Sequence, residues 1–489
     1  MGIIINQSIK NTITTYFGFV IGGLNTLFLY TNFLEKEYYG LVSYLLTASN
    51  LVWPLMAFGM HNTLIKFFSS YTNVNQRDRF MWFVLVLPVF TAAILSILGY
   101  FCYDYILYYF EGENAIVQPY AWTIFVIALA MAYFEIFFAW AKVQLKSVFG
   151  NFMKEVFHRF SVSLLLLSVY FGVLAVDHFI YAVVFVYVIR LVIMKLYAFR
   201  LHFPKMHWSL PDNYKEVLLY STLILIAGSI AIMMIDLDKF MIEQYLPIGD
   251  VAVYGMCAYI ASVIVVPSRA MHQITYPLTA KLLNEKNYEE LNVLYKQSSL
   301  NLLVISGLMF LLIICNVRAL YELVPDNYQL FILVIILIGG AKLYENLLGN
   351  NNAILFSSKY YKSVLVLGVL LAISAIGLNM LLIPKYGLNG AALATFIAVS
   401  SYNTLKIYYV QRKFGMTPLS INTLKTIMLL LVFTAGFYFW DFPFHPILNI
   451  GCKSLLLGLA YAFIIYYLKL SDDINTLLEK TGRYLKKFV

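Results

Sequence analysis

Residues 80–101 read FMWFVLVLPVFTAAILSILGYF, a run of 22 residues without a charged side chain. Because a helix rises 1.5 Å per residue, about 20 apolar residues cross the roughly 30 Å hydrocarbon layer of a membrane. A helix also satisfies its own backbone hydrogen bonds, which lipid cannot do. The run therefore predicts a membrane-spanning helix.

Similar apolar runs occur along the whole chain, and the sequence predicts an all-α membrane protein with about 14 transmembrane helices. The predicted spans are residues 11–33, 39–60, 80–101, 118–140, 157–175, 178–199, 217–240, 251–275, 298–316, 328–348, 362–383, 388–410, 423–440 and 447–468. Of the 489 residues, 61% are hydrophobic and 12% are charged, whereas soluble domains contain about 45–50% apolar and about 25% charged residues. So few charges could not cover a water-soluble fold. This composition excludes nucleic-acid-binding proteins, secreted disulfide-rich proteins and ordinary cytosolic enzymes.

The positive charges predict the orientation in the membrane. An even number of spans places both termini on one side, and that side carries 26 of the 34 Lys and Arg residues. Cytoplasmic loops of membrane proteins are enriched in Lys and Arg, so we expect both termini in the cytoplasm. The longest outer connection, about residues 102–117, is short. We therefore expect the activity to lie within the membrane.

A short internal repeat suggests two related halves. Residues 39–40 and 254–255 are both Tyr-Gly, and Lys66 matches Lys281 at the same offset. That offset corresponds to six helices, which predicts two parallel six-helix lobes like those of alternating-access transporters. The predicted domains are 1–216 (first lobe), 217–415 (second lobe), 416–470 (helices 13 and 14) and 471–489 (a cytoplasmic amphipathic tail).

The tail is predicted to form a helix on the membrane surface. Ser471 is the expected N-cap, and Asp472 and Asp473 follow in the first turn. The basic residues expected to face anionic lipid are Lys480, Arg483, Lys486 and Lys487.

Five segments carry a resemblance to a known family. They are residues 21–26 (IGGLNT), 39–41 (YGL), 56–60 (MAFGM), 238–242 (DKFMI) and 384–395 (PKYGLNGAALAT). Together they resemble the polysaccharide flippases of the multidrug/oligosaccharidyl-lipid/polysaccharide exporter superfamily, over essentially the whole length. The resemblance implies two six-helix lobes around a central cavity, with helices 13 and 14 outside it. It also implies transfer of an undecaprenyl-pyrophosphate-linked oligosaccharide from the inner to the outer leaflet of a bacterial inner membrane, driven by a coupling cation (H⁺ or Na⁺).

Cations inside predicted spans are candidates for binding the pyrophosphate. A charged side chain at mid-membrane costs about 2.5–3.5 kcal/mol, so each needs a partner or a polar cavity. The candidates are Arg190, Arg269 and Lys342, with Lys66 at the inner mouth. The resemblance supports Arg269, because a cavity arginine on helix eight recurs in these flippases. Alternatively, Lys342 pairs with Glu345, Arg269 reaches the inner headgroups, and Lys66 is a positive flank.

Carboxylates and amides inside the spans are the remaining candidates. The ion-coupling candidates are Asp236, Asp238, Glu135 and Glu345. Asp236 and Asp238 would alternatively cap the outer end of helix seven, or form the Asp-x-Asp metal site of a membrane glycosyltransferase. The candidates for contacts with the glycan are Asn25, Asn346 and Asn379, which would serve equally well as hydrogen bonds between helices.

The sequence contains no HExxH, GxSxG or P-loop motif in a fitting context. We therefore expect no enzyme, no cofactor and no metal, and we predict a lipid-linked oligosaccharide flippase. Three alternatives remain: a multidrug cation antiporter of the same superfamily, an integral-membrane polysaccharide polymerase or glycosyltransferase, and a scaffold without transport activity.

Overall fold

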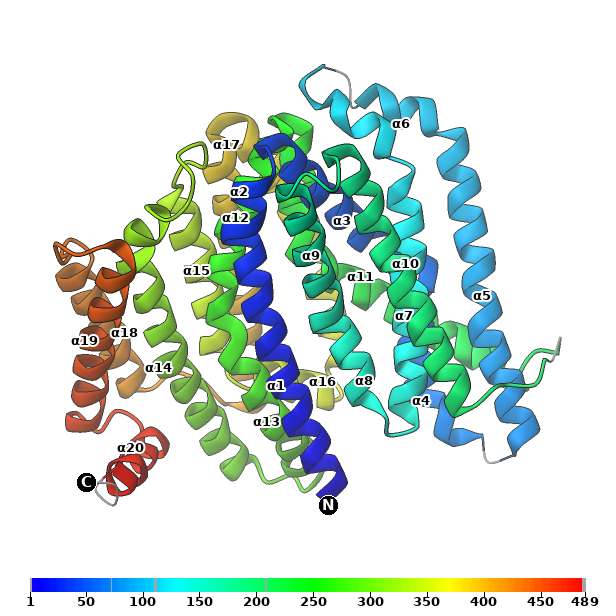
Figure 1. The fold of residues 1–489 in the computed structure, drawn as a ribbon. Coiled ribbons are helices and arrows are strands. Elements are labelled where there is room, and N and C mark those ends of the chain that lie inside the picture. Colours follow the sequence, from blue (N-terminus) through cyan, green and yellow to red (C-terminus); the bar gives the residue numbers. More distant parts are fainter. Residues whose placement is uncertain (1, 72, 110–111, 207–208, 486–489) are drawn as a thin grey trace. The chain divides into compact units, whose positions relative to one another are not determined.

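The computed structural model describes residues 2–71, 73–109, 112–206 and 209–485, and this part of the chain contains helices and no strand (Figure 1). It divides into two compact units, Met1–Met256 and Cys257–Val489. The boundary lies inside one helix, α12 (Ile248–Ser262).

The first unit consists of the helices that precede α12, with four π or 3₁₀ segments between or beside them. They are α1 (Gly2–Leu24), η1 (Asn25–Leu29), α2 (Tyr30–Phe33), α3 (Lys36–Ala57), α4 (Met60–Phe67), η2 (Phe68–Ser70), α5 (Val74–Phe101), α6 (Tyr103–Tyr109), η3 (Gly112–Tyr120), α7 (Thr123–Val143), α8 (Ser147–Phe152), η4 (Met153–Phe157), α9 (His158–Tyr170), α10 (Val176–Leu201) and α11 (Tyr214–Tyr245).

The second unit continues from α12. Its helices are η5 (Val263–Val265), α13 (Val266–Asn284), α14 (Tyr288–Tyr321), α15 (Ile332–Leu347), α16 (Asn351–Ser357), α17 (Tyr361–Phe414), α18 (Ile421–Phe437), α19 (Pro446–Tyr467) and α20 (Asp472–Leu485). Within α17, Gly387 has non-helical dihedral angles (φ 57°, ψ −136°) and separates two of the predicted spans.

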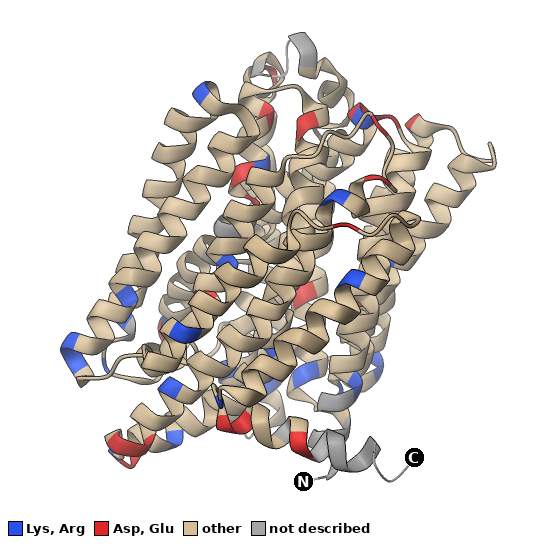
Figure 2. Ribbon diagram, turned by 90° about the vertical axis from the view of Figure 1, so that its left-hand side faces the viewer, with Lys and Arg blue, Asp and Glu red and all other residues tan. Residues whose placement is uncertain are grey.

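Every predicted span contains helix, and the chain is an all-α membrane protein. Among the described residues, nine helices are long and apolar enough to cross a membrane, and α15 with α16, bent by 56°, would make a tenth. The remaining predicted spans are not counted separately: α17 holds two spans, α18 is short, residues 157–175 lie in the interrupted run α8–η4–α9, and residues 217–240 lie in α11, which is not among the nine. Figure 2 shows that most of the ribbon carries no Lys, Arg, Asp or Glu.

Helix α7 is the centre of the first unit, where it packs against α3, α4 and α10 (Figure 1). Phe134 and Trp140 of α7 are fully buried against Met60, Leu64 and other apolar side chains. Because α7 is surrounded on several sides, a polar side chain on it is held away from lipid.

The second predicted span bends at a left-handed break. Pro54 precedes the break, and Phe58 and Gly59 both have positive φ (47° and 67°) between α3 and α4. A Cβ on Gly59 would lie 2.6 Å from the carbonyl oxygen of Ser221 on α11. Only glycine therefore combines this conformation with this close approach.

The unit boundary in α12 lies after the expected end of the first lobe at residue 216. Helix α11 packs on α3 and α4 of the first unit, which accounts for its place there. The predicted lobes 1–216 and 217–415 stay a prediction.

The tail begins as the sequence predicts. The Ser471 hydroxyl accepts a hydrogen bond from the Ile474 amide at 3.3 Å, and Asn301 donates to Asp473 at 2.6 Å. Helix α20 follows to Leu485, and Lys486 and Lys487 lie outside the described residues.

Candidate functional site

A cavity of about 420 Å³ lies within the first unit, between α3, α7, η4, α9, α10 and α11. Six of its twelve lining residues are charged, although all of them belong to predicted spans or their inner ends. The lining residues are Asn50, Trp53, Met131, Glu135, Lys154, Glu155, His158, Arg159, Tyr187, Arg190, Ile232 and Asp236. Because ionised groups at membrane depth are costly and mark functional sites, this cavity is the candidate site.

The π-helix η4 brings two of these charges to the cavity. It occupies residues 153–157, which lead into the fifth predicted span, and buries Met153 and Val156, while Lys154 and Glu155 line the cavity. Helix α1 packs directly against this turn, because a Cβ on Gly18 would overlap the carbonyl oxygen of Glu155. Single π turns of this kind are frequent at functional sites.

Among the cations that line the cavity, Arg190 on α10 is the one that forms no ion pair within the described residues. Its side chain is 6% exposed, and its guanidinium carbon lies 4.2 Å from the ring centre of Phe134 and 4.7 Å from that of Tyr187. Its Nε has no hydrogen-bond partner, and no ion pair to Arg190 occurs within the described residues. The guanidinium is therefore positioned by aromatic faces and retains donors for an anion.

The other charges of the cavity form ion pairs. Lys154 Nζ lies 2.6 Å from Glu135 Oε1, and Arg159 Nη1 lies 3.2 Å from Glu155 Oε2. Lys239 Nζ lies 2.5 Å from Asp236 Oδ1. The neighbouring Asp238 instead accepts a hydrogen bond from the Tyr254 hydroxyl.

Asp236 and Asp238 therefore point to different partners, which does not suit a shared metal ion. The described residues contain no group of three or more His, Cys, Asp or Glu side chains that could hold a metal. Of the four ion-coupling candidates, the structure brings Asp236 and Glu135 to the cavity.

The other predicted cations lie outside this cavity. Lys342 forms the i,i+3 pair with Glu345 at 3.2 Å in the second unit. Arg269 is exposed on α13, and it makes no ion pair within the described part of the chain. Lys66 is exposed at the end of α4, with Nζ 4.0 Å from the ring centre of Tyr220.

The three asparagine candidates are buried. The Asn25 amide donates to the Arg159 carbonyl at 2.8 Å, and the Asn346 amide donates to the Ile264 carbonyl at 2.8 Å. Asn379 is fully buried in α17. Asn25 and Asn346 thus connect helices, which is the alternative that the sequence left open.

Sequence reasoning missed Lys154 and Glu155 because it began the fifth span at residue 157, and it did not single out Arg159 at the start of that span. The structure begins this helix at Ser147. The signal was present: residues 149, 152, 153 and 156 are apolar at the i, i+3, i+4, i+7 spacing of a helix face.

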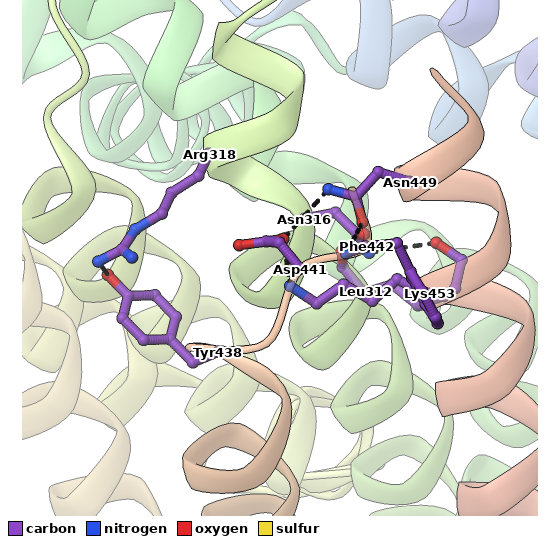
Figure 3. Close-up of polar contacts among 9 residues, drawn as sticks. Leu312, Asn316, Arg318, Tyr438, Asp441, Phe442, Asn449 and Lys453 are labelled. Carbon is purple, nitrogen blue, oxygen red and sulfur yellow. Dashed lines mark hydrogen bonds and ion pairs between the residues drawn. The ribbon is translucent and has the colours of Figure 1, made fainter. Parts of the chain in front are cut away.

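Not every intramembrane cation faces a cavity, as Lys453 on α19 shows (Figure 3). It is 1% exposed and lies 2.9 Å from Asp441 in the α18–α19 connection, while Asn449 donates to the same carboxylate at 3.2 Å. Burial opposes the charge on Asp441, but the hydrogen bonds from Lys453 and Asn449 outweigh it and lower the pKa of this carboxyl. The charge of Lys453 is therefore neutralised by Asp441, in the connection that leads into its own helix.

Three comparisons with known proteins bear on the fold. The family described as polysaccharide biosynthesis protein matches residues 8–283. No curated protein matches the sequence. Among solved structures, the lipid II flippase MurJ in an inward closed conformation is 16% identical, with a TM-score of 0.72 over 94% of this chain and 99% of that chain. An inward-facing multidrug resistance MATE family transporter of the MOP superfamily is 12% identical, with a TM-score of 0.63 over 81% of this chain and 94% of the other. At these identities the likeness shows the fold.

Proposed function

Because the chain belongs to the polysaccharide biosynthesis protein family and has the fold of MOP superfamily transporters, we propose that it is a flippase for a lipid-pyrophosphate-linked oligosaccharide. It moves this lipid from the inner to the outer leaflet of a bacterial inner membrane by alternating access. The observation that carries the proposal is Arg190, a buried guanidinium with no carboxylate partner among the described residues, in a cavity with two further cations.

The chemistry of the cavity suits a pyrophosphate. Arg190 offers a planar fork of donors, and Lys154 and Arg159 line the same space. A volume of about 420 Å³ falls in the range of small-molecule sites, about 300–1,000 Å³. The first unit therefore accommodates the pyrophosphate and adjacent sugar, and the lipid tail stays in the membrane.

The proposal includes orientation and coupling. Both termini are cytoplasmic, as the distribution of Lys and Arg indicates, so the pyrophosphate enters from the side of the termini. A proton or sodium ion drives the cycle through one of the carboxylates Asp236, Asp238, Glu135 and Glu345. The roles of Arg269, Lys342, Lys66, Asn346 and Asn379 in the second unit and at the inner mouth stay predictions.

The test is reconstitution of the purified protein into liposomes that contain a fluorescent undecaprenyl-pyrophosphate-linked oligosaccharide. We expect the wild-type protein to expose this lipid to an external quencher faster than protein-free liposomes do. Ethidium transport without lipid transfer would instead identify a drug antiporter. Growth of the glycan without transfer would identify a polymerase or glycosyltransferase.

A further inference from the structure

The cavity of the first unit contains its own anions. Three cations, Lys154, Arg159 and Arg190, and three carboxylates line it, but one of these carboxylates, Asp236, pairs with Lys239 outside the lining. Ion pairing therefore leaves one lining cation, Arg190, to face an entering anion. A pyrophosphate brings at least two negative charges into this space, so neutralising both requires that one carboxylate also gives up its cation.

The three ion pairs differ in how they are built. Arg159 and Glu155 are four residues apart on one helical run, and Asp236 and Lys239 are three residues apart on α11. The pair between Glu135 and Lys154 alone joins two helices, α7 and η4. A rotamer change can separate this pair, whereas the other two are held together by their shared helix.

Exposure within the pair also differs. The Lys154 side chain is 42% exposed, whereas that of Glu135 is 14% exposed on the central helix α7. The ammonium group is therefore accessible to an anion in the cavity, while the carboxylate lies behind it. An entering phosphate meets the lysine first.

Other cations lie near Glu135 when its ion pair with Lys154 is broken. Lys142 lies two helical turns further along α7, and Arg190 lines the same cavity from α10. The nitrogen of Lys142 lies 3.8 Å from the ring centre of Phe138 and makes no ion pair within the described residues. A displaced Glu135 thus stays in a positive environment.

We propose that Glu135 is an internal counter-anion that competes with the substrate for Lys154. Glu135 neutralises Lys154 while the cavity is empty. The ion pair breaks when the lipid enters and Lys154 binds the pyrophosphate, and it forms again when the lipid is released. Because unpaired charges at low dielectric are costly, this exchange lets the empty protein return with Lys154 neutralised. The inference rests on the proposed function and names the residue that weakens binding so that the substrate can leave.

The test is the affinity of the full-length protein in nanodiscs for inorganic pyrophosphate, measured by titration calorimetry. We expect Glu135→Gln to bind about ten-fold more tightly than wild type, which corresponds to about 1.4 kcal/mol, because Lys154 is then free. Its multiple-turnover flipping rate should fall, because release slows. Glu135→Ala should behave in the same way, and Glu135→Asp should retain near wild-type affinity.

The matched control is Glu285→Gln, which removes a carboxylate from the surface pair with Lys281 at 3.8 Å and should leave the affinity unchanged. Wild-type affinity or weaker binding in folded Glu135→Gln and Glu135→Ala would overturn the inference and leave the proposed function standing. Tighter binding by these variants, without any lipid flipping by wild type, would support the exchange and contradict the flippase function. No pyrophosphate binding by any protein would overturn both.

Discussion

Replacing Arg190 with alanine tests whether this residue binds the substrate or stabilises the fold. The side chain is nearly buried, stacks on Phe134 and Tyr187, and has no carboxylate partner in the described residues. Its removal loses cation–π contacts worth about 0.5–2 kcal/mol each. It also relieves the cost of a charge at membrane depth, about 2.5–3.5 kcal/mol on the insertion scale. These terms nearly cancel, so we expect the stability of the substrate-free protein to change by about 1 kcal/mol or less.

The affinity of Arg190→Ala for pyrophosphate should change far more than its stability. Hydrogen bonds that involve a charged group contribute about 1.5–3 kcal/mol, which corresponds to a loss of affinity of about 10- to 150-fold. Arg190→Lys keeps the charge but loses the planar fork and the stacking geometry, so we expect an intermediate affinity. Titration calorimetry with inorganic pyrophosphate and thermal unfolding of the same samples measure both quantities.

Arg318→Ala is the matched control for loss of an aromatic-stacked arginine. Its guanidinium carbon lies 4.5 Å from the ring centre of Tyr438, and it donates to that hydroxyl at 3.1 Å in the second unit (Figure 3). It should leave pyrophosphate affinity unchanged. Two results would refute the reasoning: wild-type affinity in Arg190→Ala, or a loss of several kcal/mol of stability, which would make Arg190 structural.

Three further predictions concern the fold. Gly59→Ala should lower the unfolding temperature by several degrees, because a Cβ would meet the carbonyl of Ser221 at a positive φ; an unchanged melt would contradict the close approach. The lowered pKa of Asp441 means that its ion pair stabilises the protein above about pH 4, the usual range of an aspartic acid, and is lost as the pH falls through the folded value. As the pH falls below about 4, wild type should therefore lose stability more steeply than Asp441→Asn, and equal slopes would argue against the pair. In a background without the four native cysteines, an impermeant maleimide should label Val173→Cys from outside intact cells and Lys286→Cys only after permeabilisation, and the reverse pattern would invert the topology.

The helices could be predicted because their signal is local. An apolar run such as residues 80–101 is stable in lipid because it carries no charge. It forms a helix there because a helix pairs its own backbone groups, which are costly to leave unpaired in lipid. The pair between Lys342 and Glu345 was also foreseeable, because a helix places residues three apart on one face.

The site could be predicted only in part, because two of its main contacts, Lys154 with Glu135 and Arg190 with Phe134, join different helices. Nothing in the sequence shows that Lys154 reaches Glu135, 19 residues away on another helix, or that Arg190 stacks on Phe134. The same limit applied to Asn25, whose role depends on the Arg159 carbonyl opposite it. Arg190 itself was identified by its depth in a predicted span, since a charge there needs a reason.

The most direct test of the central claim compares two lipids in proteoliposomes of the wild-type protein. Both carry the same polyprenyl chain and the same oligosaccharide, but one joins them through a pyrophosphate and the other through an uncharged ether. If the cations of the cavity select the substrate, the protein flips the pyrophosphate-linked lipid and leaves the uncharged lipid at the rate of protein-free liposomes. Equal flipping of both lipids would contradict a pyrophosphate-binding cavity.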